Sequence, residues 1–120
     1  MTEHTPLVEI NDLAIKFGTH TAVNNVTMDI GRGRIMGLVG ESGSGKSTIA
    51  NAIIGLLPHA AQISHGSIHF DGRNLQSFTA QDWGKIRGKD LACVSQDPMS
   101  ALNPTLRIGE QMLDIQHFSE

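Results

Sequence analysis

The eight residues from Gly40 to Ser47, GESGSGKS, match the full phosphate-binding loop pattern G-x-x-x-x-G-K-[ST]. An unbroken apolar run at 35–39 precedes this loop, and apolar residues recur at helical spacing from Ser47 to Leu57 after it. The run at 35–39 is typical of a central strand that is buried on both faces of a parallel sheet. The order of strand, glycine-rich loop and helix therefore predicts an α/β fold around a phosphate site.

The residue types in the loop suit a phosphate ligand. Glycines at 40, 43 and 45 let the backbone turn tightly, so that successive N–H groups can surround an anion. The helix that follows directs its positive dipole end to the same point. Lys46 supplies a mobile charge for the β and γ phosphates, and Ser47 supplies a hydroxyl for Mg²⁺. The alternative is a glycine-rich turn without a ligand, but such a turn does not require Lys followed by Ser.

The remaining elements are predicted from shorter patterns. Alternation of apolar and polar residues over 7–30 predicts two or three antiparallel strands. Residues 67–70 predict a short strand that enters a turn at Asp71-Gly72, although a carboxylate after a strand can also be catalytic. Thr79 and Asp82 resemble a capping box for a short helix to about Arg87. A strand at 91–95 and a helix from Ile108 to the last residue complete the prediction.

Length, charge and cysteine content narrow the functional classes. One domain, 1–120, is expected, and the net charge of −3 without a Lys/Arg cluster disfavours nucleic-acid binding. The single cysteine, Cys93, lies in an apolar run, which predicts a small buried hydrophobe in a reducing compartment. The sequence shows neither a signal-peptide pattern nor an apolar stretch of membrane-spanning length. Any membrane connection is therefore expected through a partner.

Two stretches carry a more specific resemblance. GESGSGKST at 40–48, together with VSQDPMSALNP at 94–104, resembles the ATP-binding subunits of bacterial ABC transporters of the oligopeptide, dipeptide and nickel importer class. Residues 22–26 and 87–89 are also similar to this family, so the resemblance covers essentially the whole chain. It implies the N-terminal half of a P-loop NTPase of the ABC ATPase type. The implied parts are an antiparallel β subdomain and an incomplete parallel-sheet core.

The resemblance implies a role for each matching residue. Phe17 would stack on adenine, and Gln96 would contact Mg²⁺ at the start of a loop that faces the membrane subunits. Without the resemblance, a core-facing strand residue is the favoured interpretation of Phe17, and a surface residue without a role is as good an interpretation of Gln96. Lys46 and Gln96 are the expected catalytic residues, and Ser47 and Gln96 the expected metal contacts. The nucleotide-binding residues implied are Phe17, Val23, Gly40, Ser42, Gly43, Ser44, Gly45, Lys46, Ser47 and Thr48.

Several family motifs do not occur in this sequence. These are the Leu-Ser-Gly-Gly-Gln-type signature, an apolar strand ending in Asp-Glu, the switch histidine and a C-terminal cysteine cluster. His65 and His69 have i, i+4 spacing but flank a predicted strand, which disfavours a metal site. The resemblance thus implies weak binding of ATP or MgATP, with no appreciable turnover by this chain alone.

The resemblance also implies partners. They are a second ATP-binding subunit, in a head-to-tail dimer, and membrane-spanning permease subunits, so the chain is expected in the cytoplasm on the inner face of the cell membrane. Two alternatives remain. One is a truncated, non-catalytic nucleotide-binding fragment. The other, which the acidic charge balance disfavours, is a non-transport ABC protein that acts on nucleic acid.

Overall fold

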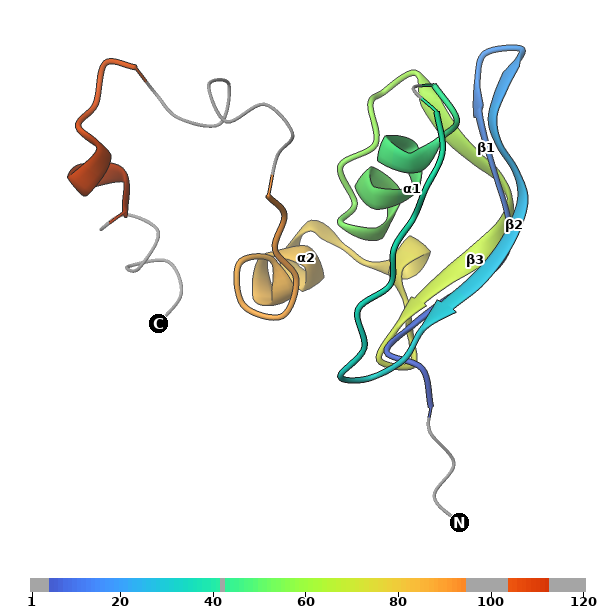
Figure 1. Cartoon of the computed structure of the whole chain (residues 1–120), viewed down its shortest axis with the longest axis horizontal. Helices are drawn as coiled ribbons and strands as arrows, with labels where there is room; N and C mark the ends of the chain where they lie inside the picture. The colour runs from blue at the N-terminus through green and yellow to red at the C-terminus, as the bar shows by residue number, and fades with distance from the viewer. Residues whose placement is uncertain (1–4, 42, 95–103, 113–120) are drawn as a thin grey trace. The chain divides into compact units, whose positions relative to one another are not determined.

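The computed structural model describes residues 5–41, 43–94 and 104–112 and divides the chain into two compact units, 1–79 and 80–120. Each unit is described by itself. The first contains strands β1 (Val8–Phe17), β2 (His20–Ile30), β3 (Ala61–Phe70) and β4 (Arg73–Asn74), with helix α1 (Lys46–Ile53) and the 3₁₀ turn η1 (Leu75–Ser77) (Figure 1). The second contains α2 (Ala80–Ile86) and a helical stretch at 108–112.

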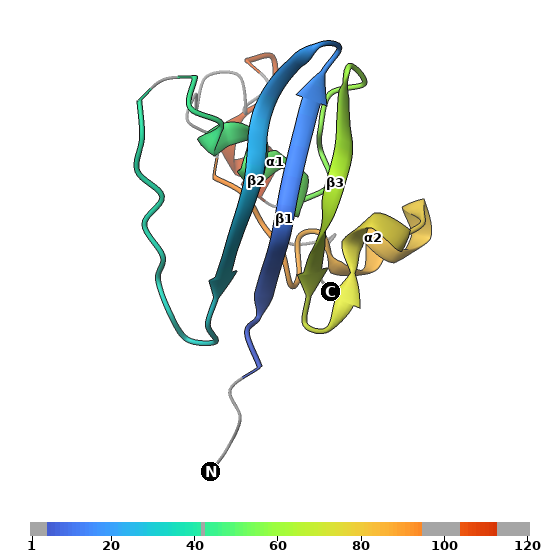
Figure 2. The same cartoon turned by 90° about the vertical axis from the view of Figure 1, so that its right-hand side faces the viewer.

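The strands of the first unit form one antiparallel sheet in the order β2-β1-β3-β4. Alternation over 7–30 predicted antiparallel strands, and β1 and β2 confirm it as a hairpin. α1 covers one face of this sheet and stands behind it in Figure 2. The buried apolar side chains of the unit come from the three long strands, α1 and η1: Val8, Ile10, Leu13, Ala14, Ile15, Val23, Ile49, Ala52, Ile68, Phe70 and Leu75.

An irregularity in β1 shapes the centre of the sheet. The pairing of β1 with both neighbours shifts after residues 10–11, and Asp12 has a positive φ of 47°. The Asp12 N–H donates to Thr27 Oγ1 at 3.0 Å, which holds the distorted backbone against β2. Across from it on β3, a Cβ at Gly66 would lie 2.4 and 2.3 Å from the carbonyl oxygens of Asn11 and Asp12. The bulge therefore requires glycine at position 66.

The turn after β3 is as predicted. Asp71 and Gly72 connect β3 to β4, and the Asp71 carboxylate forms an exposed ion pair with Arg32, which follows β2. Asn74 then caps η1, since its Oδ1 accepts from the Gln76 N–H at 2.9 Å. The carboxylate at the strand end is thus part of a turn.

Two elements of the first unit differ in length from the prediction. β3 begins at Ala61, six residues before the predicted strand, because each residue from Ala61 to Ile63 pairs with β1. α1 ends at Ile53 instead of Leu57. The N–H groups of Gly55 and Leu56 donate to the carbonyls of Ala52 and Asn51, at 3.2 and 2.8 Å, and close the last turn.

The second unit confirms the short helix that Thr79 and Asp82 predicted. α2 runs from Ala80 to Ile86, and the Arg87 guanidinium carbon lies 4.5 Å from the centroid of the Trp83 ring. The described helical stretch at 108–112 agrees with the predicted start at Ile108, and the residues after 112 over which the helix was predicted to extend lie outside the described residues. Over the described ranges, no helix is both long and apolar enough for a membrane span.

The strands predicted for a parallel sheet are not formed in the described part of the chain. Residues 35–39 have no strand structure, and Ile35 and Val39 are 102% and 94% exposed. Residues 92–94 likewise have none, and the parallel pairing present is a single bridge between Arg87 and Leu91. A strand needs a neighbour to pair with its N–H and C=O groups, and no described strand pairs with either run.

The prediction for Cys93 is wrong for the same reason. Its thiol was expected to be buried within a strand, but Cys93 is exposed. Its neighbours Ala92 and Val94 are exposed as well. An apolar run indicates that its side chains favour burial. They become buried only where another helix or strand packs against them.

Candidate nucleotide-binding site

The glycine-rich loop is held against the sheet where it enters α1. Gly45 is the N-cap of α1 and has a φ of 100°, which side chains other than glycine rarely adopt. A Cβ at this position would lie 2.8 Å from the Ala22 carbonyl oxygen and 3.4 Å from Val23 Cγ2, both on β2. The third loop glycine is therefore required by the close approach of α1 to β2.

The position of Ala22 explains how β2 makes this contact. Ile15 pairs with Val23 and Lys16 with Thr21, so Ala22 is an extra residue in β2 at a register shift. Its carbonyl oxygen lies beside Gly45. The sequence did not predict this supporting role, because the three-residue step from Val23 to Val26 marks a separate register shift of β2, between the pairs Leu13–Val26 and Ile15–Val23.

Lys46, the first residue of α1, turns its side chain back into the loop. Its Nζ donates to the Gly40 carbonyl oxygen and, at 3.2 Å, to the Glu41 carbonyl oxygen. The ammonium thus lies at the first two residues of the loop, and neither of these contacts is to a carboxylate. A phosphate oxygen entering the loop would replace neutral carbonyl partners by a charged one, which strengthens the hydrogen bonds.

The rest of the loop is a tight turn that leads into the helix. The Ser44 N–H donates to the Glu41 carbonyl at 3.1 Å, and the first bond of α1 runs from the Ile49 N–H to the Gly45 carbonyl at 3.0 Å. The amides before Ile49 belong to the first turn, whose N–H groups and dipole favour an anion. Ser47 in this turn is exposed and Thr48 is half-buried. Gly40 and Gly43 are exposed, and Ser42 lies outside the described residues.

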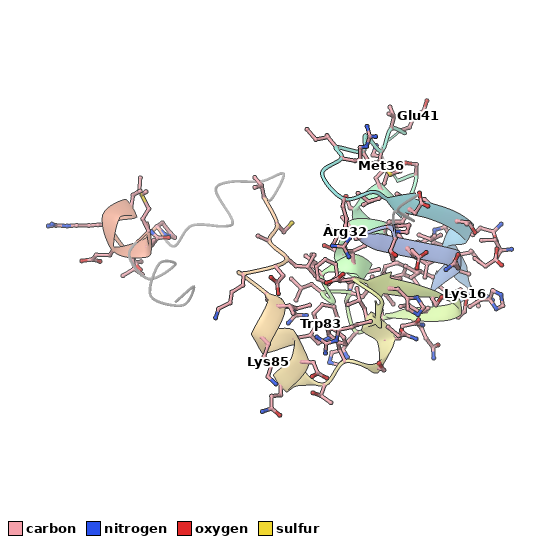
Figure 3. The ribbon with its side chains drawn as sticks, turned by 90° about the horizontal axis from the view of Figure 1, so that it is seen from below. Lys16, Arg32, Met36, Glu41, Trp83 and Lys85 are labelled. Carbon is pink, nitrogen blue, oxygen red and sulfur yellow. The ribbon has the colours of Figure 1, made fainter. Side chains whose placement is uncertain are left out.

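Phe17 lies on the same side of the sheet as the loop. Side chains alternate along β1 from Ile15, which is buried, through Lys16, which is exposed, to Phe17, which is half-buried. Figure 3 shows Lys16 on the side away from α1. Val23, also predicted at the site, is buried beneath Gly45, at the base of the loop.

The structure thus brings Val23 to the base of the loop and places Phe17 on the same face of the sheet. Gln96, the predicted magnesium contact and start of the partner-facing loop, lies outside the described residues, and so does Ser95 before it. Its role remains a prediction from resemblance.

Comparison with known proteins agrees with this arrangement. Residues 23–120 match the family model described as "ABC transporter". The dipeptide transport ATP-binding protein DppD of Lactococcus lactis is 39% identical over 112 residues, 90% of this chain and 32% of that protein. The oligopeptide transport ATP-binding protein OppD of Salmonella typhimurium is 40% identical over 113 residues, 91% of this chain and 33% of that protein.

A further relative and one solved structure are also similar. The probable D,D-dipeptide transport ATP-binding protein DdpD of Escherichia coli is 44% identical over 115 residues, 92% of this chain and 35% of that protein. The structure of a bacterial Atm1-family ABC exporter with ATP bound shares the fold at a TM-score of 0.58 and 21% identity, over 73% of this chain and 15% of that chain.

The chain spans about a third of the length of the three relatives named above. The family model nevertheless covers residues 23–120, which includes the loop, α1 and the second unit. The chain therefore belongs to the ABC transporter family.

Proposed function

We propose that this chain binds ATP, with its triphosphate in the loop from Gly40 to Thr48. The observation that carries the proposal is the Lys46 ammonium, which already lies inside the loop on the carbonyls of Gly40 and Glu41. The docking of Gly45 on β2 fixes the first turn of α1 beside it. One cation and the dipole end of a helix converge there, which suits a polyanion.

Magnesium is the expected companion of the triphosphate. Mg²⁺ neutralises phosphate charge and prefers oxygen ligands in an octahedral set that keeps several waters. The exposed Ser47 hydroxyl in the first turn of α1 fits as one such ligand. Gln96 is proposed as the second protein ligand, on the resemblance alone.

The base is proposed to stack on Phe17. This side chain lies on the loop side of the sheet and is half-buried, so part of the ring surface is available to a ligand. A fully buried aromatic residue would belong to the core. Stacking on one ring face selects for a base without reading its edge, which leaves the phosphates as the main source of affinity.

The physiological role follows from the relatives. Those reported above are named as dipeptide, oligopeptide and D,D-dipeptide transport proteins. We therefore propose that the chain is part of the energy-coupling ATPase subunit of a peptide importer, and none of these names supports the alternative of nickel. A second ATP-binding subunit and permease subunits are the proposed partners, which would hold the chain on the cytoplasmic face of the membrane.

Hydrolysis is proposed to need more than these residues. The 120 residues contain the phosphate loop but lack the signature motif and the Asp-Glu strand of the family. Binding without appreciable turnover is therefore expected for this chain alone. Steady-state ATP hydrolysis that disappears in Lys46→Ala would contradict this part of the proposal.

The decisive experiment is a calorimetric titration of the 120-residue chain with MgATP, compared between the natural sequence and Lys46→Ala. Charge-assisted hydrogen bonds contribute about 1.5–3 kcal/mol, so the dissociation constant should rise about 10- to 150-fold. Lys85→Ala is the matched control, because Lys85 is an exposed lysine on α2 outside the loop. Equal affinities for the natural chain and Lys46→Ala would refute phosphate binding at this loop.

A further inference from the structure

The tip of the β1–β2 hairpin places two aromatic rings next to each other. Phe17 is the last residue of β1 and His20 the first of β2, and they are paired directly across the two-residue turn Gly18-Thr19. Directly opposite residues of an antiparallel pair project from the same face, with Cβ atoms about 5 Å apart. His20 is therefore a side-by-side neighbour of Phe17.

This shared face is the one that carries the phosphate loop. Val23 of β2 lies against Gly45, and Val23 pairs with Ile15 of β1. β1 runs in regular register with β3 from Ile15 to Phe17, so Phe17 projects from the same face as Ile15. Lys16, between them, points away from α1 in Figure 3.

The surroundings leave the two rings accessible. On the β3 side, the residue paired with Phe17 is Ala61, whose methyl group is too small to cover a ring. His20 is exposed and Phe17 is half-buried. The two side chains are thus neighbours at the end of the sheet, on the loop side, and both keep surface that a ligand can reach.

We propose that His20 is a second base-contacting residue, which together with Phe17 gives the site a preference for purine over pyrimidine nucleotides. This rests on the proposed function. A purine has two fused rings and can lie across both side chains, whereas the single ring of a pyrimidine covers about one. Stacking of a base on an aromatic side chain raises the affinity measurably and requires only contact between the faces of the two rings.

The experiment measures dissociation constants of MgATP, MgCTP and inorganic tripolyphosphate for the natural chain, His20→Ala and Phe17→Ala. For His20→Ala, ATP affinity should fall about three- to tenfold, CTP affinity less than about twofold, and tripolyphosphate affinity should not change. Phe17→Ala should weaken both nucleotides and spare tripolyphosphate.

Two further variants separate base contact from folding. His20→Phe keeps a ring at the position and should restore the preference for ATP. His65→Ala is the matched control: His65 is an exposed histidine of β3 that pairs with Ala14 and so projects from the opposite face to Ile15. It should leave all three affinities unchanged. Unfolding midpoints of the variants should agree with that of the natural chain.

Two outcomes overturn the inference. If His20→Ala changes nothing, or weakens ATP, CTP and tripolyphosphate equally, His20 does not contact the base, and the proposed function stands as long as Lys46→Ala still reduces affinity. If the natural chain and Lys46→Ala bind all three ligands alike, the proposed function itself fails, and the contact of His20 fails with it.

Discussion

Replacing Gly66 by alanine tests whether the bulge in β1 determines the sheet. Gly66 has a φ of 86°, and an added Cβ would lie within 2.5 Å of three backbone atoms of Asn11 and Asp12. None of these atoms belongs to a flexible side chain. Relief of the clash therefore requires β1 and β3 to separate where Thr27 now holds the bulge.

The loss of stability can be worked out from its parts. A non-glycine residue at positive φ costs about 1–2 kcal/mol. Overpacking against a rigid neighbour costs about 1–3 kcal/mol more. Alanine also lowers the conformational entropy of the unfolded chain, which offsets about 0.4–1 kcal/mol of this cost. The free energy of unfolding should therefore fall by roughly 1–5 kcal/mol, compared with the roughly 5–15 kcal/mol typical of a domain.

Urea denaturation followed by far-UV circular dichroism is a suitable assay. With a slope of about 2 kcal/mol per molar urea, the midpoint should fall by about 0.5–2.5 M. Gly72→Ala is the matched control, because Gly72 has a similar φ of 80° but nothing within 4 Å of an added Cβ. It isolates the backbone contribution and should cost about 0–1.6 kcal/mol.

The difference in urea midpoint between Gly66→Ala and Gly72→Ala tests whether the close contact at Gly66 contributes to stability. If Gly66→Ala and Gly72→Ala shift the midpoint equally, the close approach of Asn11 and Asp12 to Gly66 contributes nothing. The description of the bulge as a site that excludes a side chain would then be wrong.

Two other variants address the site. Gly45→Ala should weaken MgATP binding about tenfold or more, because a Cβ 2.8 Å from the Ala22 carbonyl oxygen displaces the first turn of α1. Calorimetric titration measures this change in affinity. An unchanged affinity would argue against docking of the loop on β2. Gln96→Ala should leave ATP affinity without Mg²⁺ unchanged while reducing the gain that Mg²⁺ gives. The measurement is the ratio of the ATP dissociation constants with and without Mg²⁺, compared between the natural chain and the variant. If this ratio is the same in both, Gln96 has no role in metal binding.

Local patterns predicted the local elements of the first unit. The hairpin, the start of α1 and the turn at Asp71-Gly72 follow from alternation, from the phosphate-loop pattern and from turn chemistry, all of which act between residues close in sequence. The family and the phosphate loop were predicted from motifs in the same way. Each of these signals lies within about ten residues of the element it specifies.

What the sequence did not predict depends on partners distant in the chain. β3 extends back to Ala61 because β1 lies beside it, although Gly66 is a poor strand former. The apolar run at 35–39 was predicted as a buried strand, yet no described strand pairs with it. The contact of the Ala22 carbonyl with Gly45 likewise joins residues 23 positions apart.

The docking of Gly45 on β2 also has a thermodynamic consequence for ligand binding. A free glycine-rich loop loses much conformational entropy when it closes around an anion. Here the last loop glycine and the first turn of α1 are already restrained by Ala22 and Val23, and the Lys46 side chain already lies within the loop. Folding has thus removed part of this disorder in advance, so nucleotide binding should carry a smaller unfavourable entropy than that of the same loop excised as a peptide.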